Sequence, residues 1–449
     1  MPALRAKGLT QRAPDLYVEP GHRFGGVPLV VLSGDFMQLP PFEGRVRCSL
    51  VKPSHEHAPI EHLNGMKLFR DGVTDVVILP KTYRFVDRIV VPPRPCTVLP
   101  RLFEFMRDPE SAGGHMPNDL WRALQACEVK LNDDQRVRAL YSGALPVYEL
   151  AIAWEAVARL LQYRARRDAW SARQLVLYVQ AIDRPVKAVL SDSEHRRALQ
   201  VLNMTTTGNR LGMLPLFCGQ RVRLTAKLSA KHQLVQDAVG VVLGVDLDDR
   251  EFEASGPQGD WRTNRSHVAH TDGFVGLRYM PVGVHVKFDG YDEDVGLGIG
   301  VVYLRPLASR WTFSSHFVDD GGVRRMREVP MVRLQFPLAP EHVRTVQTAQ
   351  GMSVDKCVMY LSKPGNMNDD DWWFHVYVML SRVRCVSHLL AFGLPPDGSS
   401  SVALRSGCGM HIQILSSGRR LRPSRSQGCG HPWDSRPGQP QPRCLLSCR

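Results

Sequence analysis

Three short segments of the sequence carry side chains that can handle phosphate groups. In the first, "VPLVVLSGDFMQLPP", Asp35 and Gln38 follow a continuous apolar run at residues 27–32. Such a run is typical of a strand in a sheet that is covered on both faces, and open α/β sheets bind ligands beyond the carboxyl ends of their strands. Pro40 and Pro41 restrict the outgoing path. We expect the amide to face a phosphate or a positioned water, the alternative being an ordinary Gly-Asp turn.

The second segment, "RTVQTAQGMSVDKCVMYLS" at residues 344–362, places Gln350 and Gly351 between a threonine-rich stretch and an apolar strand. Small hydroxyl residues and a glycine allow the backbone to approach a phosphate chain closely. The competing interpretation is a plain loop before a strand.

The third segment, "FHVYVMLSRVRC" at residues 374–385, predicts a helix on which Arg382 and Arg384 point away from the apolar face. That face consists of Val376, Met379, Leu380 and Val383. A guanidinium group fixed on a packed helix can stabilise charge on a transferring phosphoryl group. The competing interpretation is a solvated basic helix face.

The elements around these segments predict an α/β fold. Apolar residues three and four apart predict helices within 102–108, 119–127 and 154–170, and short β-branched runs predict strands within 147–153, 174–183 and 356–362. From about residue 215, several short strands separated by Gly, Asp and Asn turns predict an inserted small β-barrel or twisted sheet.

The charge balance favours a polyanionic partner. The net charge is +13, and about half of the excess lies in the Gly/Ser/Pro/Arg-rich stretch from Asp397 onward, which we predict to be disordered. No apolar run has the length of a membrane span. The ten cysteines include no C-x-x-C pair, which indicates reduced thiols. The Cys and His residues of the tail match no usual zinc spacing, so no metal site is predicted.

The chain resembles the petite-integration-frequency (PIF) helicases, in the RecD-like branch of superfamily one. The resemblance rests on four segments that occur in this order: GDFMQLPP, TYRF, TVQTAQGMSVD and VYVMLSRVR. The similarity covers roughly residues 20–394 and includes "LYVQAID" and "GQRVRLTAKL". It implies a RecA-like P-loop NTPase core with ATP and Mg²⁺ bound between two lobes. The expected fold has a partial first lobe, a complete second lobe, the inserted β-barrel and the disordered tail.

The resemblance implies roles for individual residues. Gln38 would sense the γ-phosphate, and Asp35 would hold its loop in place. Arg84 of "TYRF" would reach the ATP phosphates, and Arg382 of "LSRV" would be the arginine finger. Tyr377 is expected to pack the helix.

The same resemblance implies a path for single-stranded DNA. Gln350 and Gly351 would link the nucleotide to the strand. Four further residues are expected to contact nucleic acid: Thr345, Gln347, Thr348 and Arg223. Two departures from the family pattern occur here. Gln347–Thr348 replaces a His-Lys pair, and Gln236–Asp237 replaces an Asn-Gly turn.

The chain contains no Gly-Lys dipeptide and therefore no G-x-x-x-x-G-K-[ST] loop. Its only Asp-Glu pair, Asp292–Glu293, lies in a Gly/Asp-rich turn and not after an apolar run. The resemblance thus predicts an N-terminally truncated helicase with weak or no ATPase activity.

The predicted organisation has five parts. These are a remnant of the first RecA-like lobe (1–85), a helical connection with the start of the second lobe (86–214), the inserted barrel (215–335), the end of the second lobe (336–396) and the basic tail (397–449).

The leading hypothesis is an ATP-dependent DNA helicase acting in repair, recombination or telomere maintenance. Its expected partners are single-stranded and forked duplex DNA, with no membrane partner. We expect a monomer in the nucleus, or alternatively in the mitochondrion. Two alternatives stay open: a non-catalytic single-stranded nucleic-acid-binding module and a gene fragment without function. Trp372, Trp373 and Phe374 would stack nucleobases in the module, but we favour a core anchor for them.

Overall fold

The computed structural model describes residues 83–107, 116–130, 134–187, 189–201, 203–253, 274–318, 324–365 and 367–394. Asp35, Gln38 and the basic tail from residue 397 lie outside these ranges. The described residues fall into two compact units, one of 83–145 with 349–394 and one of 146–348. The five predicted parts do not correspond to this division, and their boundaries stay predictions.

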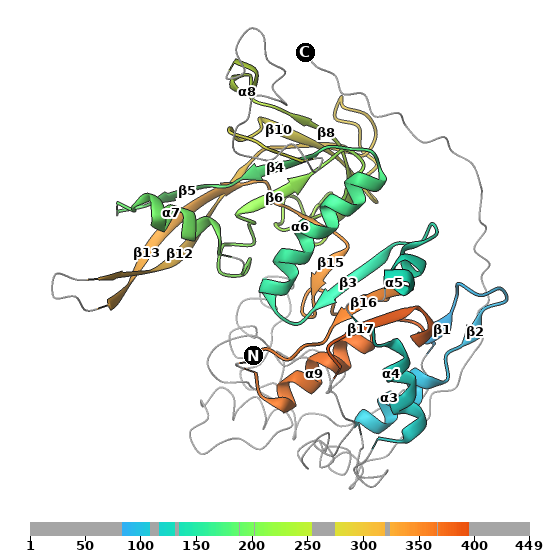
Figure 1. The fold of residues 1–449 in the computed structure, drawn as a ribbon. Helices are drawn as coiled ribbons and strands as arrows, with labels where there is room; N and C mark the ends of the chain where they lie inside the picture. The colour runs from blue at the N-terminus through green and yellow to red at the C-terminus, as the bar shows by residue number, and fades with distance from the viewer. Residues whose placement is uncertain are drawn as a thin grey trace, which may run out of the picture. The chain divides into compact units, whose positions relative to one another are not determined.

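The first unit combines short strands and helices from both ends of the described chain (Figure 1). Its elements are β1 (Val86–Asp87), β2 (Arg94–Pro95), α3 (Val98–Arg107), α4 (Asn118–Cys127), α5 (Asp134–Tyr141), β16 (Lys356–Tyr360), α9 (Asp369–Leu380), the 3₁₀ turn η4 (Val386–His388) and β17 (Leu389–Phe392). Strands β16 and β17 pair in parallel. The predicted helices within 102–108 and 119–127 and the strand within 356–362 are confirmed.

Helix α9 is buried on nearly all sides, which differs from the predicted two-faced helix. Its residues from Val376 to Leu380 are all at most 2% exposed, and Arg382 just beyond its end is 1% exposed. Trp372 donates its indole N–H to the Leu361 carbonyl oxygen at 2.6 Å. Trp372 and Trp373 are buried, so the core-anchor interpretation of these two residues is confirmed. The idea of a solvated basic face is wrong for Arg382, because the helix is a core element of its unit.

The second unit holds most of the strands. Its elements are β3 (Val147–Ala151), α6 (Trp154–Ser171), β4 (Val176–Gln180), β5 (Ile182–Pro185), α7 (Asp192–Leu199), β6 (Met213–Leu216), β7 (Arg221–Leu224), β8 (Val239–Asp246), α8 (Arg250–Glu253), β9 (Phe274–Gly276), β10 (Gly283–Phe288), β11 (Val301–Leu304), β12 (Leu307–Val318), β13 (Arg324–Gln335), β14 (Leu338–Pro340) and β15 (Val343–Thr345). The predicted helix within 154–170 is confirmed, as are the strands within 147–153 and 174–183.

The strands of the second unit form separate sheets and one parallel pair. Strands β11, β10, β8, β7 and β14 make a five-stranded sheet in that order, with antiparallel pairings throughout. Strands β6, β4 and β9 make a second sheet, and β15 pairs in parallel with β3. The described pairings of the five-stranded sheet run in one line from β11 to β14. A closed barrel therefore stays a prediction, and the inserted segment is observed as a sheet.

The long antiparallel ribbon β12–β13 belongs to the same predicted insertion (Figure 1). At its base β13 also pairs with β5, from Met331 opposite Pro185 to Leu334 opposite Ile182. Alternate ribbon side chains pack into a core cluster with α7. The cluster consists of Leu190, Ala198, Trp311, Phe313, Val329 and Met331.

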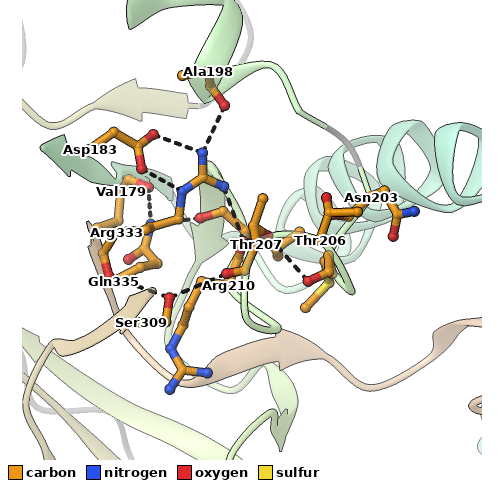
Figure 2. A network of polar contacts seen from close by, with 12 residues as sticks. Val179, Asp183, Ala198, Asn203, Thr206, Thr207, Arg210, Ser309, Arg333 and Gln335 are labelled. Carbon is orange, nitrogen blue, oxygen red and sulfur yellow. Dashed lines mark hydrogen bonds and ion pairs between the residues drawn. The ribbon is translucent and has the colours of Figure 1, made fainter. Parts of the chain in front are cut away.

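Polar side-chain contacts connect the ribbon to β5 and α7 at two points. At the base, Arg333 donates to both carboxylate oxygens of Asp183, at 2.8 and 2.7 Å, and to the Ala198 carbonyl oxygen at 2.8 Å (Figure 2). Further along, Glu194 of α7 accepts hydrogen bonds from Ser315 and from Arg327. Both sets of contacts join segments more than a hundred residues apart in the sequence.

The cysteines of the described residues are free thiols. Burial raises the pKa of Cys127 to about 11, so this thiol stays protonated at neutral pH. None of the helices in the described ranges has the length and hydrophobicity that a membrane span needs.

Candidate nucleotide and nucleic-acid sites

The first unit brings Arg84 and Arg382 to the same residue. Arg84 donates from Nη1 to the Ser381 carbonyl oxygen at 3.0 Å. Arg382 donates from Nη2 to the Ser381 hydroxyl at 2.5 Å and from Nε to the Val378 carbonyl oxygen at 2.9 Å. Two guanidinium groups that the sequence separates by almost 300 positions therefore lie beside the carboxyl-terminal end of α9.

Aromatic packing holds the Arg84 segment against this helix. Phe85 stacks on Phe103 of α3 with ring centroids 5.2 Å apart. Phe103 in turn meets Tyr377 of α9 edge-on at 5.0 Å. Arg107 donates to the Tyr377 hydroxyl at 3.1 Å, and Tyr377 is 1% exposed. The prediction that Tyr377 packs the helix is confirmed, and the stack explains how the position of Arg84 is fixed.

Backbone hydrogen bonds connect the arginines to the turn that carries Gln350 and Gly351. Val354 donates its N–H to the Arg382 carbonyl oxygen at 2.8 Å, and Arg384 donates back to the Val354 carbonyl oxygen at 3.0 Å. The turn is exposed at Gln350 and Gly351, and Gly351 has a φ of +89°. A Cβ atom there would meet open space, so the glycine serves the backbone conformation and leaves the turn open to an approaching group.

Burial sets a condition on any phosphate contact by Arg382. Its guanidinium group is held by Val378 and Ser381 and lies 3.5 Å from the Met352 carbonyl oxygen. A phosphate can reach this group only if it displaces one of these bonds. Arg84 is half-buried and is the more accessible of the two. The phosphate roles of both residues stay predictions.

The predicted nucleic-acid residues lie in the second unit. Thr345 is fully buried, and its hydroxyl lies 3.1 Å from the Thr348 hydroxyl. Thr348 also donates its N–H to the Thr345 hydroxyl at 3.3 Å. Gln347 is exposed between them. These contacts shape a tight turn after β15, in which Gln347 is the residue most open to a ligand.

Arg223 occupies a buried ion-pair cluster. It donates to Asp237 at 2.9 Å, and Arg344 donates to the same carboxylate oxygen at 3.2 Å and to the Thr348 carbonyl oxygen at 3.3 Å. Burial, together with the nearby Arg344, lowers the pKa of Arg223 to about 10. At 3% exposure, Arg223 acts on the turn through Asp237 and Arg344. Its direct contact with nucleic acid stays a prediction that this geometry does not support.

Arg344 is a residue that the sequence reasoning missed. It precedes Thr345 on β15 and joins the Arg223–Asp237 pair to the Thr348 turn. Its sequence signal is weak, because an arginine on an otherwise buried strand reveals a partner only when a distant acid is known.

Among the described residues, no group of three or more His, Cys, Asp or Glu side chains has the arrangement of a metal site. The described carboxylates therefore provide no cluster for Mg²⁺.

No protein-family model matches the sequence, and no curated protein matches it. Solved structures of Pif1 helicases resemble the chain. The enzyme from Candida albicans shares 18% identity over 71% of this chain and 57% of its own length, with a TM-score of 0.39. A Bacteroides Pif1 bound to single-stranded DNA shares 14% identity over 83% of this chain and 64% of its own, with a TM-score of 0.43. The chain thus spans less than two thirds of the length of these two structures.

Proposed function

We propose that this chain is a PIF-type helicase core that holds ATP phosphates near Arg84 and Arg382 and binds single-stranded DNA. The observation that carries the proposal is the meeting of these two arginines at Ser381, backed by the Gln350–Gly351 turn. Arginine is always charged and presents a planar fork of donors that matches phosphate oxygens. Paired guanidinium groups can neutralise charge on a triphosphate, which is what phosphoryl transfer requires.

The finer parts of the proposal rest on the sequence resemblance. We propose Mg²⁺ as the nucleotide's metal, forked duplex DNA as a further partner and a monomeric chain. Repair, recombination or telomere maintenance would be the process, in the nucleus or alternatively the mitochondrion. Asp35 and Gln38 would complete the nucleotide site.

Nucleotide binding to the full chain tests the proposal. We expect a fluorescent ATP analogue to bind, and Arg84→Ala to weaken its binding about 10-fold, because a charge-assisted hydrogen bond is lost. Arg382→Lys keeps the positive charge but loses the planar set of guanidinium donors, so it should weaken binding as well. Arg88→Ala removes an exposed arginine four positions from Arg84 and serves as the control.

Equal binding by all four proteins, or no binding by any, would contradict the nucleotide site. A binding module without catalysis is the second candidate, favoured by the net charge of +13 and by the absence of a Gly-Lys dipeptide. It predicts salt-dependent binding of single-stranded DNA that ATP does not change.

A further inference from the structure

Helix α6 carries a stripe of alternating arginine and aromatic residues on its exposed side. The stripe consists of Arg159, Tyr163, Arg166, Trp170 and Arg173, at successive spacings of four, three, four and three residues. These spacings place Arg159, Tyr163, Arg166 and Trp170 along one face of the helix, over about 16 Å. Arg173 lies just past the helix end and continues the stripe. The opposite face is buried through Val157, Leu161, Ala165 and Ala169, among others.

The two aromatic rings of the stripe are unusually open to solvent. Tyr163 is 67% exposed and Trp170 is 77% exposed. Neither side chain has a hydrogen bond or ring contact with any other part of the described chain. Exposed aromatic rings offer flat apolar faces on which a planar partner can stack.

The charges beside the rings are positive. Arg159 and Arg173 have no ion-pair partner among the described residues. Arg166 donates to the Tyr178 hydroxyl at 2.8 Å and lies over the Tyr178 ring, which fixes its position on the surface. The nearby acid Asp168 is paired with two arginines outside the stripe, and the exposed Glu155 lies one turn before Arg159.

The backbone at Arg173 supports a role for this side chain. Arg173 has a φ of +55°, the left-handed conformation in which helices usually end on glycine. Gln174 closes the helix end by donating its N–H to the Ala169 carbonyl oxygen at 2.8 Å. An arginine at this position costs conformational energy that glycine would avoid, and it places a cation at the end of the stripe.

We propose that the outer face of α6 is a binding site for single-stranded nucleic acid, with Tyr163 and Trp170 stacking on bases and Arg159, Arg166 and Arg173 contacting phosphates. Single strands combine exposed aromatic faces with regularly spaced negative charges, and proteins bind them by stacking platforms within basic surfaces. An acidic protein would satisfy the arginines but would leave the rings without a flat partner, so the alternation of the two residue types favours nucleic acid.

This site deepens the single-strand binding of the proposed function and rests on that part of it, but none of its residues belongs to the arginine cluster around Ser381, and binding there needs no nucleotide. The two ideas fail separately. If Arg84→Ala leaves ATP-analogue binding unchanged while the α6 variants still lose nucleic acid, the nucleotide site is refuted and the α6 site stands.

Fluorescence anisotropy with a labelled oligothymidylate tests the α6 site in the full chain. The double variant Tyr163→Ala/Trp170→Ala should weaken binding at least 10-fold, because each stacked base is lost. The variant Arg159→Ala/Arg173→Gly should reduce the slope of log K against log salt by about 1.4, since each phosphate contact on a single strand contributes about 0.7. It should also unfold at an equal or higher temperature than the wild type, because glycine suits the helix end.

The control variant Arg184→Ala/Lys187→Ala removes two exposed positive charges elsewhere in the same unit. It should leave binding within about 2-fold of the wild type. Unchanged affinity of the aromatic double variant would overturn the proposal, as would equal losses in the control and arginine variants. A photoreactive oligothymidylate should crosslink to peptides that contain Tyr163 or Trp170, and crosslinks only elsewhere would likewise overturn it.

Discussion

Asp237 occupies a backbone position that glycine would adopt with less strain. Asp237 has a φ of +68° at the position where the PIF-like pattern has the glycine of an Asn-Gly turn. Its carboxylate compensates Arg223 and Arg344, both of which are 3% exposed. Without this acid the two buried arginines would lose the carboxylate that both of them hydrogen-bond, which would destabilise the turn. The altered turn therefore has an electrostatic function that glycine lacks.

His342 gives the second unit a measurable acid sensitivity. Burial, together with the charge of Arg164, lowers the pKa of His342 to about 4, although Glu341 and Asp168 oppose the shift. Between pH 6.5 and pH 4, His342 is mostly protonated in the unfolded chain but mostly neutral in the folded chain, so a falling pH favours unfolding. We expect the free energy of unfolding to fall by up to about 3 kcal/mol as the pH drops from 6.5 to 4.

Urea unfolding at several pH values checks this expectation with a matched variant. His342→Gln cannot take up the proton, so its stability should decline less than that of the wild type over the same pH range. Parallel pH curves for the two proteins would show that His342 is not the responsible group.

At the scale of elements, the Arg333–Asp183 pair is a buried side-chain link between β13 and β5, which also pair as strands. The side chains are 0% and 1% exposed, and the Arg333 guanidinium also lies 4.8 Å from the centre of the Trp311 ring. Asp183→Asn leaves a buried guanidinium without its carboxylate. We expect this change to lower the free energy of unfolding by about 3–5 kcal/mol, measured by denaturation followed by circular dichroism.

The exposed pair Arg101–Asp119 offers a control for the same chemical change. Its side chains are 54% and 59% exposed, so water already solvates both charges. Asp119→Asn should change the stability far less than Asp183→Asn does. Similar losses for the two variants would mean that burial does not determine the strength of the Arg333–Asp183 pair.

At the scale of the whole molecule, local patterns predicted the elements, and long-range partners escaped prediction. Apolar periodicity identified α4, α6 and β16, because each signal lies within one short segment. The partner of Arg333 lies 150 positions away and that of Arg344 lies 107 positions away. No local spacing encodes such pairs. The helix α9 was predicted, but its full burial was not, since burial depends on what the rest of its unit packs around it.

The whole chain also determines what ATP chemistry we expect. A P-loop lysine and its metal supply much of the charge neutralisation for phosphoryl transfer, and the chain has no Gly-Lys dipeptide. We therefore expect ATP turnover near background in a phosphate-release assay, with or without single-stranded DNA. Rapid DNA-stimulated turnover would contradict this expectation and would require another cation in the lysine's role.

The two sets of polar contacts that hold the β12–β13 ribbon also affect how it can move. Arg333 joins its base to β5, and Glu194 joins its middle to α7 through Ser315 and Arg327. Separating the base of the ribbon from β5 breaks the buried Arg333–Asp183 pair, and separating its middle from α7 breaks the hydrogen bonds to Glu194. We therefore expect the ribbon and α7 to unfold locally as one cooperative unit.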